Sequence, residues 1–232
     1  MVQEDVKKLV AYSSVAHLGF VMIGLFALNQ QGIAGGMLQM INHGISTGAL
    51  FLIVGFIYER RHTRLITDFG GLSKQMPIFA TIFMIVTFSS IGLPGTNGFV
   101  GEFLVLLGGF ESGLRTWTII ASSGVILSAV YMLWMFQRVM FGELTNPKNQ
   151  VLKDLNAREI VIMAPLIVMI FVMGIYPTPF IDKMNPSIDR LIVQMKQKQV
   201  AHVVAPVTAP GRAGIPAGYP ELPSGHPAGE AK

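Results

Sequence analysis

The chain has 232 residues, of which 51% are hydrophobic and 13% are charged, with a formal net charge of +4. Globular domains carry about 25% charged residues, so this chain has too few charges to cover a soluble surface. The composition excludes a soluble enzyme, a nucleic-acid-binding domain and a disordered protein, and it indicates an integral membrane protein in contact with the lipid bilayer. The absence of cysteine excludes disulfides and thiolate-bound metal or iron–sulfur sites on this chain.

Five apolar stretches lie between the charged segments, and we expect each of them to be helical. About 20 helical residues cross the hydrocarbon core of a bilayer, a length that four of the stretches match as single spans. The sequence therefore predicts an all-α integral membrane protein with five transmembrane helices. The predicted spans are residues 9–28, 33–58, 77–110, 117–136 and 160–180.

The third stretch, 77–110, is too long for a single span. A helix of that length would extend about 51 Å, whereas the hydrocarbon core is about 30 Å thick. Gly92, Pro94 and Gly95 stand in its middle and disfavour an unbroken helix. We predict one discontinuous span, broken from Gly92 to Asn97, which is typical of buried or hydrated transport sites. The alternative is a proline kink in an ordinary packed helix.

The charges between the predicted spans indicate the orientation. Ten lysines and arginines fall on the side that includes the N-terminus, and one falls on the other side before the C-terminal tail. Because cytoplasmic loops carry the excess of positive charge, we expect the first side to be cytoplasmic and the C-terminus to be external. The two groups are Lys7, Lys8, Arg60, Arg61, Arg64, Lys74, Arg138, Lys148, Lys153 and Arg158 on the first side, and Arg115 on the other.

Two sets of neighbouring basic residues on the first side have further interpretations. Lys7 and Lys8 are expected at the cytoplasmic interface, from which either could snorkel towards a proton entrance. The cluster at residues 59–64 is expected to be a solvated anchor or a partner contact.

The C-terminal part of the chain changes in character after the last span. Residues 181–199 have apolar side chains at helical spacing with basic residues between them, which predicts an amphipathic helix on the membrane or on a partner. Residues 200–232 are rich in proline and glycine, so we expect them to be disordered. The transmembrane region is thus expected to be residues 1–180.

Glu102 is the only formal charge between Met76 and Phe110. An ionised carboxylate in the middle of a bilayer costs about 2.5–3.5 kcal/mol on insertion scales, and intramembrane ionisable residues are usually functional. We therefore interpret Glu102 as a proton-accepting group that burial keeps neutral near physiological pH. The alternative is a carboxyl group that only makes hydrogen bonds for helix packing.

His17 and His43 are the other ionisable side chains within predicted spans 9–28 and 33–58. Gln39, Asn42, His43, Ser46 and Thr47 share one helical stripe, which could line a hydrated path on which imidazole relays protons. Interhelical hydrogen bonding is the alternative, worth about 0.6–2 kcal/mol per contact. No His-x-x-x-His pair or neighbouring acid appears, so no metal site is predicted. On the opposite side, Gly44 and Gly48 predict close helix packing.

Several segments together resemble the antiporter-like membrane subunits of respiratory complex I, the NADH–quinone oxidoreductase. The segment around the break is similar to the subunit M (ND4-type) version, with Glu102 where sister subunits and most Mrp antiporter subunits carry lysine. These segments are residues 3–20, Asn42-His43-Gly44, residues 58–64, and Gly92-Leu93-Pro94-Gly95-Thr96-Asn97-Gly98-Phe99-Val100-Gly101-Glu102-Phe103.

The resemblance implies the C-terminal part of a fold of about fourteen helices built from two inverted repeats. We expect the chain to be a fragment that needs the N-terminal remainder of its subunit. Glu102 would then lie at the outward proton exit, with His17 and His43 in a central water chain.

The resemblance also implies partners and a location. NADH, FMN, iron–sulfur clusters and quinone would bind to partner subunits rather than to this chain. Other membrane-arm subunits of complex I would be its neighbours, in a bacterial inner membrane. Alternative functions are a subunit of an Mrp-type cation/proton antiporter or of a membrane-bound hydrogenase, and a non-catalytic membrane scaffold.

Overall fold

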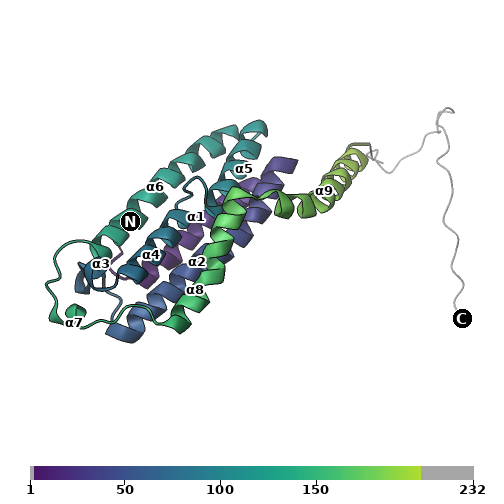
Figure 1. Ribbon diagram of the computed structural model, residues 1–232. Coiled ribbons are helices and arrows are strands. Elements are labelled where there is room, and N and C mark those ends of the chain that lie inside the picture. The colour runs from purple at the N-terminus through teal and green to yellow at the C-terminus, as the bar shows by residue number, and fades with distance from the viewer. Residues whose placement is uncertain (1–2, 205–232) are drawn as a thin grey trace, which may run out of the picture. The chain divides into compact units, whose positions relative to one another are not determined.

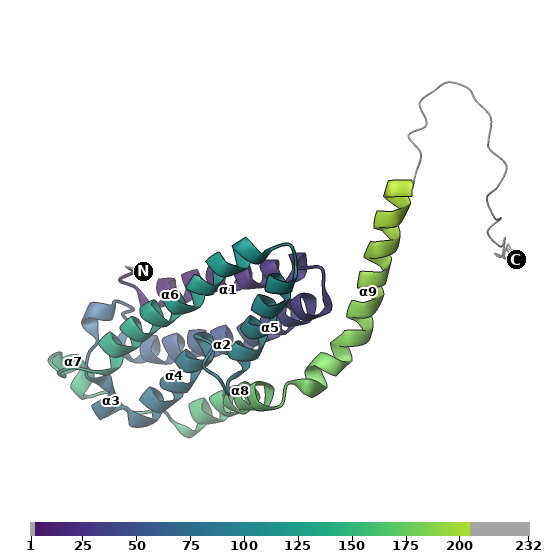
Figure 2. The same ribbon diagram turned by 90° about the horizontal axis from the view of Figure 1, so that it is seen from above.

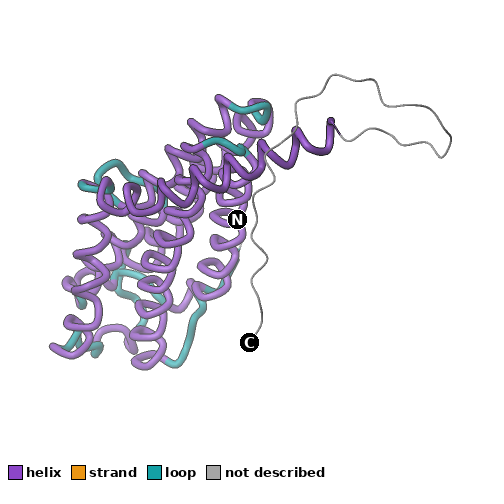
Figure 3. The backbone as a smooth tube through the Cα atoms, turned by 90° about the vertical axis from the view of Figure 1, so that its right-hand side faces the viewer, coloured by secondary structure: helices purple, strands orange, loops and turns teal. Residues whose placement is uncertain are grey.

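The computed structural model describes the backbone of residues 3–204 and the side chains of residues 3–198. Within that part of the chain the regular elements are helices, joined by loops and one isolated β-bridge (Figures 1 and 3), which confirms the all-α prediction. The elements are α1 (Val6–Phe26), α2 (Gln30–Arg61), η1 (Ile66–Asp68), α3 (Leu72–Gln75), α4 (Pro77–Ser90), α5 (Asn97–Glu111), α6 (Arg115–Met140), α7 (Pro147–Gln150), α8 (Ala157–Ile175) and α9 (Thr178–Val204).

Four helices, α1, α2, α6 and α8, are long and apolar enough to cross a membrane. They cover most of the first, second, fourth and fifth predicted spans, and they run along one another in a bundle (Figure 2). The third predicted span, 77–110, corresponds to α4 and α5, which have 14 and 15 residues. Neither is long enough to span the core alone, so a single crossing built from both helices remains a prediction.

Side chains at the helix ends explain where α1 and α2 begin. Asp5 accepts a hydrogen bond from the backbone N–H of Lys8 at the start of α1. Asn29 does the same for Gly32 at the start of α2. Such caps satisfy backbone donors that have no partner within the helix, and each contributes about 1 kcal/mol.

The interruption between α4 and α5 falls on residues 91–96, where the break was predicted. Gly92 and Gly95 have φ angles of +73° and +91°, a region that L residues with a side chain rarely adopt. The backbone therefore has a positive φ angle at two positions of the connecting turn. These two positions end α4 and allow α5 to begin in a new direction.

Glycines bring α1, α2 and α5 unusually close together. A Cβ atom added to Gly24 would lie 2.6 Å from the carbonyl oxygen of Gly32, and one added to Gly35 would lie 2.6 Å from the amide nitrogen of Val105. At Gly44 and Gly48 an added Cβ would meet no described atom within 4 Å, so the close packing that their spacing permits remains a prediction. The small-residue contacts are made near the other end of α2.

A larger apolar core lies between α2, α4 and α6. Phe79 and Phe83 of α4 and Met132 and Met135 of α6 are almost completely buried there. This packing fixes the first two turns of α4, which are the turns furthest from the break. It thereby helps to hold the last turn of α4 against α2.

Helix α9 begins soon after α8 and contains the segment predicted to be amphipathic, residues 181–199. Ile188 is 1% exposed and packs against Ile33 and Ala34 of α2, next to Met184 and Ile192. Its contact with a membrane remains a prediction. Of the tail predicted to be disordered, residues 200–204 belong to α9, and residues 205–232 lie outside the described part of the chain.

Candidate functional site

Glu102 lies on α5, less than two turns after the break, and is 5% exposed. Its Oε1 atom is 3.3 Å from Nδ1 of His17 on α1. The same oxygen accepts a long hydrogen bond of 3.4 Å from the amide of Gln39 on α2. Three helices thus contribute to the surroundings of one buried carboxyl group.

His17 stands between Glu102 and His43. Its Nδ1 atom faces Glu102 but makes no hydrogen bond to any described residue, so the pair has the distance of an ion pair without the direction of a hydrogen bond. Its Nε2 atom lies 3.4 Å from the hydroxyl of Ser90, at the end of α4. The ring of His43 is 5.6 Å away, centroid to centroid, and its Nδ1 atom lies 2.9 Å from the hydroxyl of Thr47.

The three residues proposed from the sequence for proton transfer are therefore neighbours in the order His43, His17, Glu102. The two histidines line a small cavity of about 10 Å³, together with hydroxyl and amide side chains of α2 and α4. A volume of this size is close to what a single water molecule requires. The lining is polar, so water at that point would find hydrogen-bond partners.

The break leaves the space that the carboxyl group of Glu102 occupies. A Cβ atom added to Gly92 would lie 2.5 Å from Oε2 of Glu102. Gly95 has a similarly positive φ angle, but an added Cβ there would meet no atom within 4 Å. Pro94 is exposed in the connecting turn. Gly92 therefore serves both the backbone turn and the site, whereas Gly95 serves the turn.

A set of hydrogen bonds that the sequence did not predict holds the two ends of the break to α2. Asn97, at the start of α5, is fully buried. Its side-chain oxygen accepts from Ser89 on α4, and its carbonyl oxygen accepts a 2.7 Å hydrogen bond from the amide of Asn42. Ser46 of α2 lies 2.6 Å from Ser89, hydroxyl to hydroxyl.

These contacts separate two roles on the polar stripe of α2. Asn42 and Ser46 make the interhelical hydrogen bonds that were the alternative interpretation of the stripe. Gln39 and His43 extend instead towards the carboxyl–imidazole cluster. Only the sequence Thr96-Asn97 after two glycines hinted at Asn97, as a polar residue at a helix start.

Lys7 and Lys8 are exposed at the start of α1. His17 is nine residues further along the same helix, a rise of about 14 Å, so these lysines do not join the buried cluster. Their proposed interfacial role remains a prediction.

Arg60 is not the solvated anchor that the sequence suggested. Its guanidinium donates two hydrogen bonds, of 2.7 and 2.6 Å, to the carboxylate of Glu159, which is 2% exposed. Glu159 also accepts from the backbone N–H of Asn156, whose side chain in turn caps α8. The spacing of Asn156 and Glu159 is a capping-box signal that was present in the sequence. The pairing with Arg60 had no local signal.

Within the described residues, no group of three or more histidine, aspartate or glutamate side chains could hold a metal ion. The bundle combines four membrane-length helices with two short helices that meet at a buried polar cluster. These features are typical of a multi-pass membrane protein with a polar site inside its helical bundle.

Residues 1–128 match the sequence pattern of the family described as "NADH:quinone oxidoreductase/Mrp antiporter, TM", and the chain belongs to this family. The resemblance to the antiporter-like subunits of complex I is thereby confirmed. The chain is 52% identical over 193 residues to "NADH-quinone oxidoreductase subunit M" of Rhodobacter capsulatus, covering 83% of this chain and 37% of that protein. It is 48% identical over 192 residues to "NADH-ubiquinone oxidoreductase chain 4" of Marchantia polymorpha, covering 82% and 38%.

Solved structures show the same fold. A chain of respiratory complex I from Thermus thermophilus with bound NADH matches with a TM-score of 0.76 and 33% identity, over 82% of this chain and 40% of that chain. A chain of the Mrp complex from Dietzia sp. DQ12-45-1b matches in fold with a TM-score of 0.74 and 17% identity, over 82% and 43%. The chain thus spans about two fifths of the length of the relatives that it matches.

Proposed function

We propose that this chain forms the outer, exit part of a proton path in a subunit M-type membrane subunit of NADH–quinone oxidoreductase. The observation that carries the proposal is the buried carboxyl group of Glu102, with His17 Nδ1 3.3 Å away and His43 behind it. The names of the similar proteins support the assignment to that enzyme, and the geometry supports proton transfer as the role of the chain.

The facing atoms of His17 and Glu102 favour one proton between them. With no proton, a ring lone pair faces a carboxylate, and the two repel each other. With a proton on both atoms, two donors face each other. One proton gives either a carboxylic acid donating to imidazole or an imidazolium beside a carboxylate. After a small rotation of the ring aligns the two atoms, the proton moves along the hydrogen bond between oxygen and nitrogen and interconverts the two forms. A second proton arriving from the side of His43 would therefore displace the first towards the exit.

The surroundings suit such a change of protonation state. Glu102 has no arginine or lysine partner among the described residues, so the carboxyl group is not locked in its charged form. The amide of Gln39 can donate a hydrogen bond to Glu102 when the carboxyl group is ionised. Because this hydrogen bond is long, 3.4 Å, it can break when the carboxyl group is neutral. The hydrogen bonds of Asn97 keep α5, and hence Glu102, in position while the charge changes.

Partners and location belong to the same proposal. NADH oxidation and quinone reduction would take place on other subunits, with FMN and the iron–sulfur clusters, and this chain would hold no redox centre. It would contact other membrane-arm subunits in a bacterial inner membrane. The end of the bundle with Arg60, Arg61 and Lys148 would face the cytoplasm and the C-terminus would be external, following the distribution of charge.

The test is the substitution Glu102→Gln in the complete enzyme, measured as proton uptake into inverted membrane vesicles and as NADH–quinone turnover. We expect proton translocation to fall by at least about tenfold, because glutamine has nearly the same shape but cannot exchange a proton. Glu111→Gln, an exposed position on the same helix, is the matched control and should leave both rates unchanged. An assembled Glu102→Gln enzyme that pumps normally would contradict the proposal.

His17→Gln is a second test of the same path. We expect a loss of pumping comparable to that of Glu102→Gln, since His17 is the nearest ionisable neighbour of the carboxyl group. If the substitutions abolish sodium- or potassium-dependent antiport and leave NADH-linked turnover intact, the chain serves an Mrp-type antiporter instead. If they reduce only assembly, the polar cluster is structural.

A further inference from the structure

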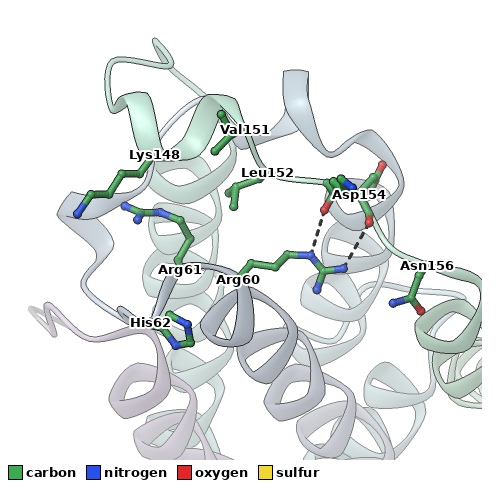
Figure 4. A pocket seen from close by; sticks show the side chains of 9 residues that line it. Arg60, Arg61, His62, Lys148, Val151, Leu152, Asp154 and Asn156 are labelled. Atoms are coloured by element: carbon green, nitrogen blue, oxygen red, sulfur yellow. Dashed lines mark hydrogen bonds between the residues drawn. The ribbon is translucent and has the colours of Figure 1, made fainter.

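A basic cavity of about 850 Å³ lies at the end of the bundle where α2 stops and α8 starts (Figure 4). The end of α2, the short helix α7 and the segment leading into α8 form its wall. Arg61 and His62 come from the first of these, Lys148 from the second, and Lys153 and Asp154 from the third. The buried cluster around Glu102 shares no residue with this cavity.

The positive charges of the cavity exceed the negative ones that could neutralise them. Arg60 also borders the cavity, but its charge is matched by Glu159. Asp154 is occupied: its carboxylate accepts from the backbone N–H groups of Ile78 and Phe79, at 2.8 and 3.0 Å, and so caps α4. These two carboxylates therefore hold other groups and do not turn towards the remaining cations.

Three cations are left for a ligand. Arg61 donates a 2.6 Å hydrogen bond to the side-chain oxygen of Asn149, a neutral partner that orients the guanidinium without cancelling its charge. The ammonium groups of Lys148 and Lys153 have no carboxylate partner among residues 3–198. The side chains of Arg61 and Lys148 extend in the same direction in Figure 4. A guanidinium with two ammonium groups is a typical set of donors for phosphate oxygens.

Exposed apolar side chains stand at the edge of the cavity and on the first turns of α8. Val151 is 78% exposed at the rim, and Val161, on the second turn of α8, is 70% exposed. Since α8 is one of the membrane-length helices, its first turns mark the level at which headgroups meet hydrocarbon. A ligand with a phosphate and an acyl chain can place the first among the cations and the second along α8.

We propose that this cavity binds the headgroup of an anionic phospholipid, whose phosphate is held by Arg61, Lys148 and Lys153. Basic pockets beside membrane helices on the cytoplasmic side bind anionic headgroups in this way. The lipid fits better than an acidic protein segment because the cations are next to exposed apolar side chains at the start of a membrane helix. The inference is independent of the proton path, since no residue of that path lines the cavity.

The experiment titrates the complete, delipidated protein in a zwitterionic detergent with dioctanoyl phosphatidylglycerol and with dioctanoyl phosphatidylcholine, and measures bound lipid by native mass spectrometry. We expect phosphatidylglycerol to bind at least about tenfold more tightly than phosphatidylcholine. The double substitution Lys148→Gln/Lys153→Gln should weaken phosphatidylglycerol binding by about tenfold. Both lysines are exposed, so the variant should fold, and an unchanged thermal unfolding temperature checks this.

Lys74→Gln/Arg158→Gln is the matched control. It removes two exposed cations that lie at the same end of the helical bundle but do not line the cavity. It should change phosphatidylglycerol affinity by less than about twofold. Equal weakening in the two double variants would show that net charge alone attracts lipid, and would overturn the proposal.

Two further arms distinguish the sources of phosphate and the other kind of partner. Inorganic phosphate that binds with the same sensitivity to Lys148→Gln/Lys153→Gln, and that phosphatidylglycerol does not displace, would make a free anion the ligand. Lys148 could instead crosslink to an acidic segment of another subunit in the intact complex. If Lys148→Gln/Lys153→Gln removes that crosslink without any change in lipid binding, the cavity is a protein interface. Either result would overturn the lipid proposal.

Discussion

Two buried glutamates occupy opposite kinds of surroundings in this bundle. Glu159, 2% exposed, accepts two short hydrogen bonds from Arg60 and one from a backbone N–H group. Glu102, 5% exposed, has one long hydrogen bond from Gln39 and a histidine nitrogen that faces it without a hydrogen bond. Burial is nearly the same at the two positions, and the difference lies in how completely each carboxyl group is satisfied.

The comparison separates a carboxyl group that serves stability from the one that we propose for proton transfer. A carboxylate that accepts two hydrogen bonds from a guanidinium stays ionised, because protonation of the carboxylate would leave the buried cation without its partner. A carboxyl group with weak neutral donors and a neighbouring imidazole loses little in either state. Glu159 therefore ties α8 to α2, whereas the surroundings of Glu102 agree with the proposal that it exchanges a proton.

The largest expected effect is on stability at Glu159. Glu159→Gln should lower the free energy of unfolding by about 3–5 kcal/mol, because it leaves the charge of Arg60 without its partner in a mostly buried position. Glu102→Gln should change it by less than about 1 kcal/mol. Denaturant titration of both variants in mixed micelles measures the difference, and the double variant Arg60→Gln/Glu159→Gln should recover part of the loss. Similar losses at Glu102 and Glu159 would remove the distinction drawn above.

An intermediate effect is expected at the break. Gly92→Ala and Gly95→Ala both place a side chain at a positive φ angle, which costs about 1–2 kcal/mol. Only at position 92 does the new Cβ crowd the carboxyl group of Glu102. We therefore expect Gly92→Ala to reduce proton translocation about tenfold, equivalent to about 1.4 kcal/mol, and Gly95→Ala to reduce it less than about twofold. Equal rates in assembled enzymes carrying either variant would argue against a role of Gly92 in the site.

The smallest effect is expected at an exposed ion pair. Arg64 Nε lies 3.5 Å from a carboxylate oxygen of Asp5, and the Arg64 side chain is 41% exposed. Arg64→Gln should cost less than about 1 kcal/mol of unfolding free energy. Asp5→Ala should cost more, about 1 kcal/mol from the lost cap of α1 alone. Thermal unfolding of both variants at low and high salt separates the two, since only the ion pair is screened; a larger loss in Arg64→Gln would contradict this ranking.

The sequence predicted the long helices well because a membrane helix can be recognised from a short stretch of neighbouring residues. About 20 consecutive apolar residues are enough to identify a span, and the glycines and proline at 92–95 are enough to identify its interruption. Glu102, His17 and His43 were found for a similar reason, since each is an ionisable residue in an apolar stretch. The short helices α3 and α7, of four residues each, carry no such periodic signal and were not predicted.

Which glycines pack could not be read from the spacing. Gly32 and Gly36 have the same G-x-x-x-G spacing as Gly44 and Gly48, and only the former pair lies against α1. Spacing states which residues share a face of a helix, but not which face meets another helix. The choice depends on neighbours from distant parts of the chain.

By itself the sequence determined that this is a membrane protein, which segments are helical and where the chain is interrupted between α4 and α5, and it led to the hypothesis that Glu102 carries a proton. All of these follow from the transfer of contiguous apolar residues out of water and from the high cost of a charge among them. The tertiary structure decided that Glu102 faces His17, that Asn97 binds Asn42 and Ser89, and that Arg60 neutralises Glu159. Those pairs, apart from Ser89 and Asn97, join residues more than 50 positions apart, and only the packing of the helices brings them within hydrogen-bonding reach.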